Sequence, residues 1–283
     1  MEYDLQTSCA EIIGVLFKTH KDSVAELVNS CKTKVIPAAM SSSVVKRYRF
    51  AIFILDDMVE HLGPTYFSPE DWQTIVNTIC SYCDHTSASL RQASAYGIGI
   101  LAQNSGEAFQ GCSELCLTSL KKAIDVPVTE KVQGKKEKMI EYNHARDNAI
   151  ASIGKILKHQ SALVWQNAAM ASQLVSYWIS LLPITHDLEE AQAQYEFLCD
   201  FIREEKVFTD EGAVQTATQL ATVFGESFQD KYFAKDSEQK AKQAAVLSYL
   251  VNEAPAPIQE AFKGACEKLA AECQARIKAA LGA

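Results

Sequence analysis

The sequence predicts an all-α fold built from stacked helix pairs, an α-solenoid. Similar helix-length segments recur along the chain, at 10–21, 46–64, 90–106 and 145–160, with looser copies at 192–205 and 241–254. Apolar residues within them recur at steps of three and four, which is the period of an amphipathic helix. No alternation of apolar and polar residues, the pattern of a half-buried strand, is sustained over five residues.

The spacing of these copies indicates the type of repeat. Aligned on the position of Asp56, the copies centre on Gly14, Asp56, Gly99, Gly154, Cys199 and roughly Ser248. The successive steps are 42, 43, 55, 45 and 49 residues. A period in the low forties is typical of HEAT or armadillo units, whereas tetratricopeptides repeat near thirty-four residues. We therefore expect a single domain over residues 1–283, formed by about six HEAT repeats in a right-handed superhelix.

The first three repeats are expected at 1–40, 41–84 and 85–126. Their helix pairs are predicted at about 4–19 with 22–39, 43–62 with 69–83, and 87–104 with 107–126. Ser68 is a predicted N-cap, because Pro69 suits the first helical position and acidic residues follow in the first turn. The helix at 87–104 is expected to begin at Ser87 or Ser89 and to end near Gly106.

The last three repeats are expected at 141–183, 187–228 and 236–283. Their helix pairs are predicted at 141–159 with 168–182, at Asp187 onward with 211–228, and at 236–252 with 256–281. Asp187 is a predicted N-cap with Glu190 as its capping-box partner. Between the third and fourth repeats, residues 127–140 begin with a proline, are rich in lysine and have few apolar residues, which predicts a solvated loop. All seven prolines are expected at helix ends or connections.

Composition favours an ordinary soluble, intracellular protein. Hydrophobic residues make up 48% and charged residues 22% of the chain. No apolar run approaches the roughly 18 residues needed to span a bilayer, so we expect no membrane insertion. The first fifteen residues lack the basic and apolar regions of a signal peptide. Nine cysteines, an odd number, favour reduced thiols over a disulfide framework.

The formal charge of −8 is unevenly distributed. Between Asp187 and Glu211 there are nine acidic and two basic residues, a local balance of −7. An acidic face disfavours direct binding of nucleic acid and favours a basic protein partner. The alternative interpretation is a solvated helix surface, because such surfaces are usually charged.

Several fragments resemble chemical motifs, but none predicts catalysis, a cofactor or a metal. Gly97 and Gly99 match a loose dinucleotide fingerprint, yet they lie inside a predicted helix, where small residues allow helices to pack closely. The pairs Cys80 with Cys83 and Cys112 with Cys116 have apolar neighbours and are better explained as buried small residues than as zinc ligands.

The acidic end of segment 46–64 resembles a carboxylate and histidine cluster, formed by Asp56, Asp57, Glu60 and His61. A helix-borne metal or acid–base site needs matching ligands from a facing helix, and no second copy occurs in the sequence. These acids are therefore candidates for contact with a protein. Trp178 is most simply a core aromatic residue, although an exposed Trp178 could receive a partner's phenylalanine.

Four segments resemble a known family: FAIFILDDMVEHLGP (50–64), LRQASAYGIGILAQ (90–103), DNAIASIGKILK (147–158) and WISLLPITHDLEEAQAQYEFLCDFI (178–202). Their order, spacing and helical context resemble the carboxy-terminal HEAT repeats of karyopherin-β (importin-β) nuclear transport receptors. The most similar subgroup is the importin-beta-three or importin-five type, which carries ribosomal proteins and histones. The chain is therefore expected to be a carboxy-terminal fragment or a truncated relative.

This resemblance implies a non-catalytic receptor that shuttles between cytoplasm and nucleus. It implies basic protein cargo on the inner side, bearing nuclear localisation signals, Phe-Gly nucleoporins on the outer side, and Ran-GTP bound through amino-terminal repeats missing from this chain. Candidate protein-binding residues are Asp56, Asp57, Glu60, Trp178, Asp187, Glu189, Glu190 and Asp200. The alternative is a generic HEAT-repeat scaffold subunit of a phosphatase or chromatin complex.

Overall fold

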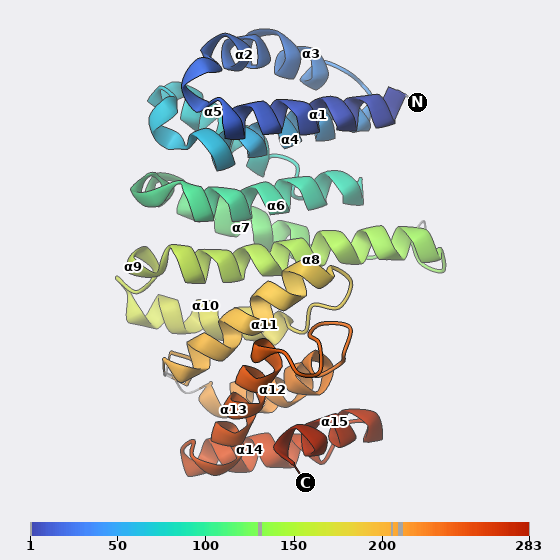
Figure 1. The fold of residues 1–283 in the computed structure, drawn as a ribbon, viewed down its shortest axis with the longest axis vertical. Coiled ribbons are helices and arrows are strands. Elements are labelled where there is room, and N and C mark those ends of the chain that lie inside the picture. The colour runs from blue at the N-terminus through green and yellow to red at the C-terminus, as the bar shows by residue number, and fades with distance from the viewer. Residues whose placement is uncertain (1, 130–131, 205, 209–211, 283) are drawn as a thin grey trace. The chain divides into compact units, whose positions relative to one another are not determined.

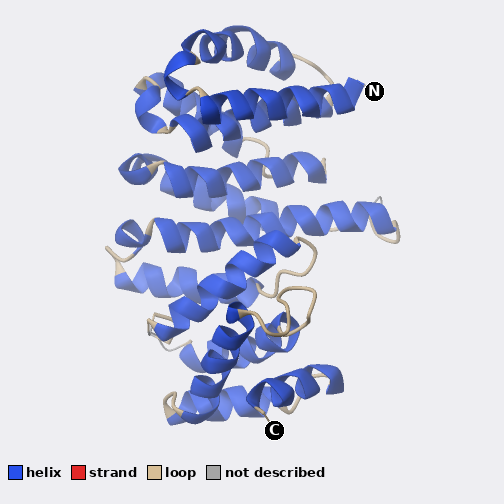
Figure 2. Cartoon of the chain, in the orientation of Figure 1, coloured by secondary structure: helices blue, strands red, loops and turns tan. Residues whose placement is uncertain are grey.

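The computed structural model describes residues 2–129, 132–204, 206–208 and 212–282. Throughout this part of the chain the regular structure is helical, with no strand, as the sequence predicts (Figure 2). The helices stack as antiparallel pairs, which is the arrangement of an all-α solenoid. None of the described helices is both long and apolar enough to cross a membrane.

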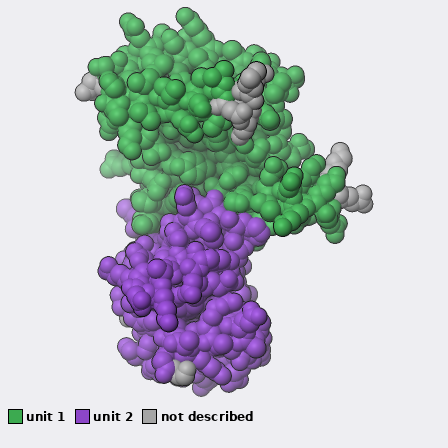
Figure 3. All heavy atoms as spheres, turned by 45° about the vertical axis from the view of Figure 1, so that its right-hand side comes forward, with its two compact units in different colours: residues 1–160 green, residues 161–283 purple. Residues whose placement is uncertain are grey.

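The chain divides into two compact units, residues 1–160 and residues 161–283 (Figure 3). The division falls inside the predicted fourth repeat, 141–183. Each unit is described below by itself. The prediction of one domain over residues 1–283 stays a prediction.

The first unit is organised around a series of long helices that pack side by side (Figure 1). These are α1 (Glu2–Thr19), α4 (Val45–Leu62), α6 (Ala88–Asn104) and α8 (Lys136–His159). Each of the first three is followed by a second helical layer, formed by α2 (Ala25–Ser30) with α3 (Ile36–Met40), by α5 (Pro69–Cys80) and by α7 (Ser113–Asp125). Helical segments therefore occur where the first three helix pairs are predicted. The predicted helix at 107–126 begins as a 3-10 segment (Gly106–Cys112), and α7 follows from Ser113.

The predicted helix at 22–39 is interrupted. A short 3-10 turn (Lys21–Ser23) precedes α2, and residues Cys31–Val35 form a π-helical turn in which the Ile36 amide donates to the Cys31 carbonyl. Pro37 follows in the first turn of α3. A proline ring crowds the carbonyl four residues before it and lacks an amide donor, so a wider turn ahead of Pro37 relieves both effects.

Small residues set how closely the long helices approach. A Cβ atom at Gly99 of α6 would lie 2.7 Å from Ser152 Oγ and 2.9 Å from Lys155 Cδ of α8. Ser152 Oγ also donates to the Ala95 carbonyl at 2.6 Å, and Gln160 Nε2 donates to the Ala102 carbonyl at 2.7 Å. Gly97 and Gly99 thus serve close helix packing, as the sequence predicts.

The second unit holds α9 (Ser161–Val164), α10 (Ala168–Leu181), α11 (Leu188–Arg203), α12 (Ala213–Ser227), α13 (Glu238–Asn252), α14 (Ala256–Cys266) and α15 (Ala271–Leu281). Here α10, α12 and α14 pack in series, and α11 packs on α13. Its core is rich in aromatic residues, among them Trp178, Tyr195, Phe201, Phe224 and Phe262, each at most 2% exposed.

Two further boundaries differ from the prediction. The last helix, predicted at 256–281, is two helices, because the chain bends after Cys266 and α15 packs back on α12, where Gly225 leaves room for Leu269 and Cys273. The predicted loop at 127–140 is shorter, because α8 begins at Lys136. Residues 136–140 contain Lys, Glu and Met, which are good helix formers. Within the loop, Glu130 and Lys131 lie outside the described residues.

Candidate protein-binding site

The first group of candidates lies in the last two turns of α4. Asp56 and Asp57 are adjacent in sequence, but successive helical positions point about 100° apart, so their side chains leave the helix in different directions. Asp56 is 3% exposed, Asp57 is half-buried and Glu60 is exposed. Of these three acids, Glu60 alone presents an exposed carboxylate.

Glycines on the two neighbouring helices receive the two aspartates. A Cβ atom at Gly14 of α1 would lie 2.5 Å from Asp57 Oδ2, and a Cβ atom at Gly97 of α6 would lie 2.2 Å from Asp56 Oδ1. Each carboxyl group therefore occupies the space that a larger residue on the next helix would fill. Asp56 and Asp57 belong to the packing of α4 between α1 and α6.

Burial changes the protonation of both groups. Burial first, and then the charges of Asp57 and Glu60, raise the pKa of Asp56 well above its usual range. Neither carboxyl oxygen of Asp56 has a hydrogen-bond partner among the described residues. Burial, reinforced by Glu60, also raises the pKa of Asp57 to about 7. A basic partner is attracted by ionised carboxylates, and the raised pKa of Asp56 disfavours its ionised form at such a surface.

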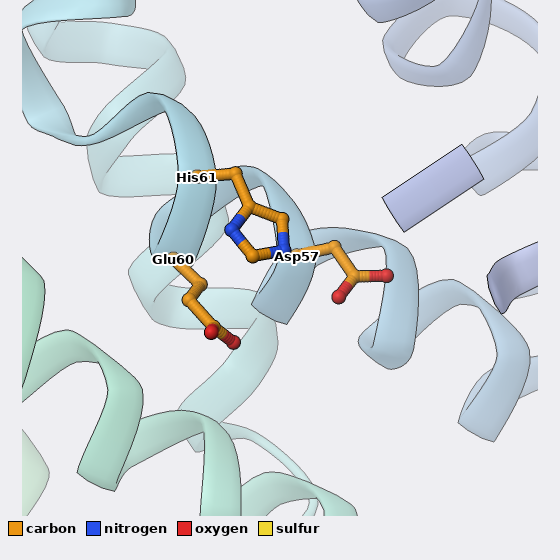
Figure 4. A group of neighbouring side chains, drawn as sticks. All are labelled: Asp57, Glu60 and His61. Atoms are coloured by element: carbon orange, nitrogen blue, oxygen red, sulfur yellow. The ribbon is translucent and has the colours of Figure 1, made fainter. Parts of the chain in front are cut away.

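Asp57, Glu60 and His61 are the described residues that could offer ligands to a metal ion (Figure 4). Their ligand atoms lie within 4.8 Å of one another, and all three leave the same helix. The pKa of His61 is lowered, mainly by burial, while Glu60 acts to raise it and Lys18 and Lys21 lower it further. The positive charges of these two lysines also oppose binding of a cation, so the arrangement favours no particular metal chemistry.

The second group of candidates lies at the start of α11. Asp187 is the N-cap of this helix, as predicted, and its Oδ1 accepts a hydrogen bond from the Glu190 amide at 3.2 Å. Glu190 is 8% exposed, so it belongs to the core side of the helix. Glu189, which points about 100° away from Glu190 around the helix, is exposed. Among these three acids, Glu189 is the one whose side chain is accessible to a partner.

Asp200 takes part in an ion pair between two helices. Lys242 of α13 places its Nζ 2.6 Å from Asp200 Oδ1 and 4.0 Å from Glu196 Oε1. This pairing partly neutralises the acidic face of α11. Three further acids of the predicted acidic stretch, Glu205, Asp210 and Glu211, lie outside the described residues.

Trp178 lies in the core. Its side chain is 0% exposed, and its ring centroid lies 5.5 Å from that of Phe197, which in turn lies 5.0 Å from Phe201. The simpler interpretation of Trp178 as a core aromatic residue therefore agrees with the structure. An aromatic ring without exposed surface offers no receptor for a partner's phenylalanine.

The cysteine pairs are also internal. Cys80, Cys83, Cys112 and Cys116 are buried, and Cys80 Sγ lies 3.9 Å from Cys116 Sγ across α5 and α7. Burial and the neighbouring Cys80 and Asp84 raise the pKa of Cys83 above its usual range. The raised pKa favours the protonated thiol of Cys83, and a protonated thiol is a poor metal ligand.

Sequence reasoning did not find Lys242 as the partner of Asp200, nor the glycines that receive Asp56 and Asp57. Lys242 lies 42 residues from Asp200, so no helical spacing links them. The alignment of Gly14 with Asp56 carried part of the signal, because it places a glycine and an acid at equivalent positions of successive repeats. Gly97, which receives Asp56, lies two residues before the aligned Gly99.

No family model matches the chain. Among curated proteins, it is similar to Importin subunit beta-3 from Saccharomyces cerevisiae, with 25% identity over 153 residues. The match covers 54% of this chain and 13% of that protein, so the chain spans a small part of its relative's length. This partial similarity and the stacked helix pairs support a karyopherin-like HEAT fold.

Proposed function

We propose that the chain is the carboxy-terminal part of a nuclear transport receptor of the karyopherin-β type, which binds protein cargo without covalent chemistry. The observation that carries the proposal is the similarity to Importin subunit beta-3 over 153 residues. The stack of α1, α4, α6 and α8 adds support, because stacked repeats form extended binding surfaces. The receptor shuttles between cytoplasm and nucleus, contacts Phe-Gly nucleoporins, and binds Ran-GTP through amino-terminal repeats outside this chain.

Its cargo is a basic, lysine-rich protein segment such as those of ribosomal proteins or histones. The charge of −8 supports this assignment, and Glu60 and Glu189 are the candidate acids that lie fully at the surface. Charge complementarity of this kind mainly gives specificity and fast association. Asp187 and Glu190 organise α11, and Asp200 pairs with Lys242, so they act on cargo only indirectly.

The cargo assignment is tested by replacing Glu189 with lysine. Binding of a fluorescein-labelled Lys-rich peptide at low salt is expected to weaken about fivefold, because an exposed ion pair contributes about 0.2–1 kcal/mol. Glu253→Lys is the matched control, since Glu253 is also exposed and the charge change is the same. If both variants weakened binding equally, the effect would come from the net charge of the chain. That result would contradict a cargo surface at α11.

Binding of Phe-Gly repeat peptides separates a transport receptor from a scaffold subunit of a phosphatase or chromatin complex. A transport receptor immobilised on a column is expected to retain such peptides. It is expected not to retain peptides in which the phenylalanines are replaced by serine. Failure of the chain and of its full-length parent to bind them would favour the scaffold.

A further inference from the structure

One side of α1 exposes apolar residues, although α1 is the first of the helices that pack side by side (Figure 1). Leu5, Ile12 and Val15, here called the α1 stripe, are 64%, 60% and 57% exposed. Their spacing of seven and three residues places them on the same side of the helix. Ile12 points about 160° away from the buried Gly14, which receives Asp57 of α4. The α1 stripe therefore lies away from the face of α1 that packs on α4.

The α1 stripe differs from the outer surface of a closed stack. A repeat that caps a stack turns a polar face outward, because that face meets water. The exposed polar residues within the stripe, Ser8 and Thr19, are small and uncharged, and Thr19 Oγ1 donates to the Val15 carbonyl at 2.7 Å. This side of α1 is thus typical of a helix that packs between two neighbours.

The repeat alignment shows which positions the α1 stripe occupies. It aligns Gly14 with Asp56, Gly99 and Gly154. In the same register, Ile12 and Val15 each have one counterpart on α4, on α6 and on α8. The counterparts of Ile12 are Ile54, Gly97 and Ser152, and those of Val15 are Asp57, Ile100 and Lys155. All of these counterparts are buried except Asp57, which is half-buried, whereas Ile12 and Val15 are exposed.

Four of these counterparts contact the preceding helix of the series, and each meets the residue aligned with Gly14. The contacts are those of Asp57 with Gly14, of Gly97 with Asp56, and of Ser152 and Lys155 with Gly99. The same arrangement occurs in three successive pairs of helices. The positions of Ile12 and Val15 are therefore those through which a helix of this stack packs on the helix before it.

A glycine takes part in each of the three pairs. A Cβ atom at Gly14, Gly97 or Gly99 would lie between 2.2 and 2.7 Å from the nearest facing side-chain atom. The helices therefore approach this closely only where one side of the contact is small. Ile12 and Val15 are both β-branched, so the small residue has to come from the facing helix.

We propose that the α1 stripe is the docking surface for a helix of a preceding HEAT repeat in a longer parent chain, and that this helix carries glycine or alanine at the position aligned with Gly14. The proposal rests on the proposed function only for the existence of that longer chain. A second copy of this chain fits less well, because two α1 stripes facing each other would supply no glycine to the contact.

The test compares the 283-residue chain with its full-length parent, both carrying Cys9→Ser to remove the exposed native thiol. Ile12→Cys is introduced into both, and its reaction with fluorescein maleimide is followed by mass spectrometry of the labelled peptide. The rate is expected to be more than about tenfold lower in the parent, because a packed thiol reacts only during local opening. Met170→Cys on α10, 65% exposed, is the control and is expected to react equally fast in both proteins.

The sequence of the parent gives a second test. The steps between aligned residues run from 42 to 55 along this chain, so the residue that faces the α1 stripe is expected that far upstream of Gly14. Replacing this residue by leucine is expected to raise the labelling rate of Ile12→Cys in the parent and to leave that of Met170→Cys unchanged, because the larger side chain no longer lets the helices approach.

Equal labelling of Ile12→Cys in chain and parent, a large side chain at the aligned position, or no effect of its replacement by leucine would overturn the proposal. So would labelling of the 283-residue chain that slows with rising protein concentration and matches that of the parent, because the occupant would then be a second copy. Binding of Phe-Gly peptides by the parent is measured separately. A parent that protects Ile12→Cys without binding these peptides would contradict the transport function and support the docking surface.

Discussion

Two adjacent aspartates of α4 show how little a side chain's identity says about its role. Asp56 and Asp57 both seemed suited to contact a basic partner, yet each packs against a glycine on a different neighbouring helix. Glu60, one turn further on, is exposed and keeps that role open. The position on the helical circumference, relative to α1 and α6, decides between packing and binding.

Asp57 predicts a pH dependence of stability. Its ordinary pKa of 3.8 is raised to about 7 in the folded chain, first by burial and then by Glu60. A group that holds its proton more tightly when folded stabilises the chain below the unfolded pKa, and this stability is lost as the pH rises through the folded pKa. The free energy of unfolding is therefore expected to fall between pH 3.8 and about 7.

Asp57→Asn should flatten this decline, since an amide does not titrate. Urea denaturation at a series of pH values measures the effect. Glu11→Gln on the exposed side of α1 is the control and should retain the wild-type slope. An unchanged slope in Asp57→Asn would contradict the assignment.

The glycine contacts predict opposite effects for two Gly→Ala substitutions. At Gly97 the new methyl group would lie 2.2 Å from Asp56 Oδ1 and 2.9 Å from Ile79 Cγ2, so overpacking should destabilise the chain. The expected loss is about 1–3 kcal/mol. At Gly264 of α14 the methyl group would meet nothing within 4 Å, and reduced freedom of the unfolded chain should add about 0.4–1 kcal/mol. Urea denaturation followed by circular dichroism distinguishes the two signs, and stabilisation by Gly97→Ala would contradict close packing there.

At the scale of the helix, local signals determined which boundaries could be predicted. Ser68 Oγ accepts from the Asp71 amide at 3.1 Å, and Asp187 caps α11, so both predicted N-caps are confirmed. By contrast, no proline or glycine directly follows the end of α14, and Gly264 lies inside its last turn. Leu269 and Cys273 continue an apolar period across the bend, and only the distant Gly225 explains why α15 packs back.

The cap of α11 predicts a measurable contribution to stability. Asp187→Ala removes the acceptor for the Glu190 amide and is expected to lower the free energy of unfolding by about 1 kcal/mol. Asp187→Asn is the matched control, because asparagine caps about as well as aspartate. The comparison is made by urea denaturation at neutral pH. Equal losses in both variants would assign the effect to the charge of Asp187 and not to its hydrogen bond.

The candidate site was predicted less well than the fold, for a physical reason. Helical periodicity places Glu189 and Glu190 on different sides of α11 but cannot say which side is covered. The ion pair of Lys242 with Asp200 and the hydrogen bond from Gln192 to the Tyr232 carbonyl each join residues about 40 positions apart. Such contacts come from the stacking of repeats, which a single sequence specifies only through its apolar pattern.

At the scale of the whole molecule, each of the two units contains buried apolar residues of its own. In residues 1–160, α6 is buried around most of its circumference, including Leu90, Ile98 and Leu101. In residues 161–283, the aromatic side chains of α10, α11, α12 and α14 are buried. Repeat stacks are stabilised by contacts between neighbours, so each unit holds many of the contacts it needs.

This organisation predicts that fragments 1–160 and 161–283 fold separately. Each is expected to show helical circular dichroism and a cooperative urea transition. A cut after Asn104 is the control: it separates α6 from α7 and α8, leaves the apolar face of α6 without cover, and should give fragments with shallow, non-cooperative transitions. If 1–160 and 161–283 are unfolded alone but fold when mixed, the chain is one cooperative domain, as the continuous repeat pattern of the sequence predicts.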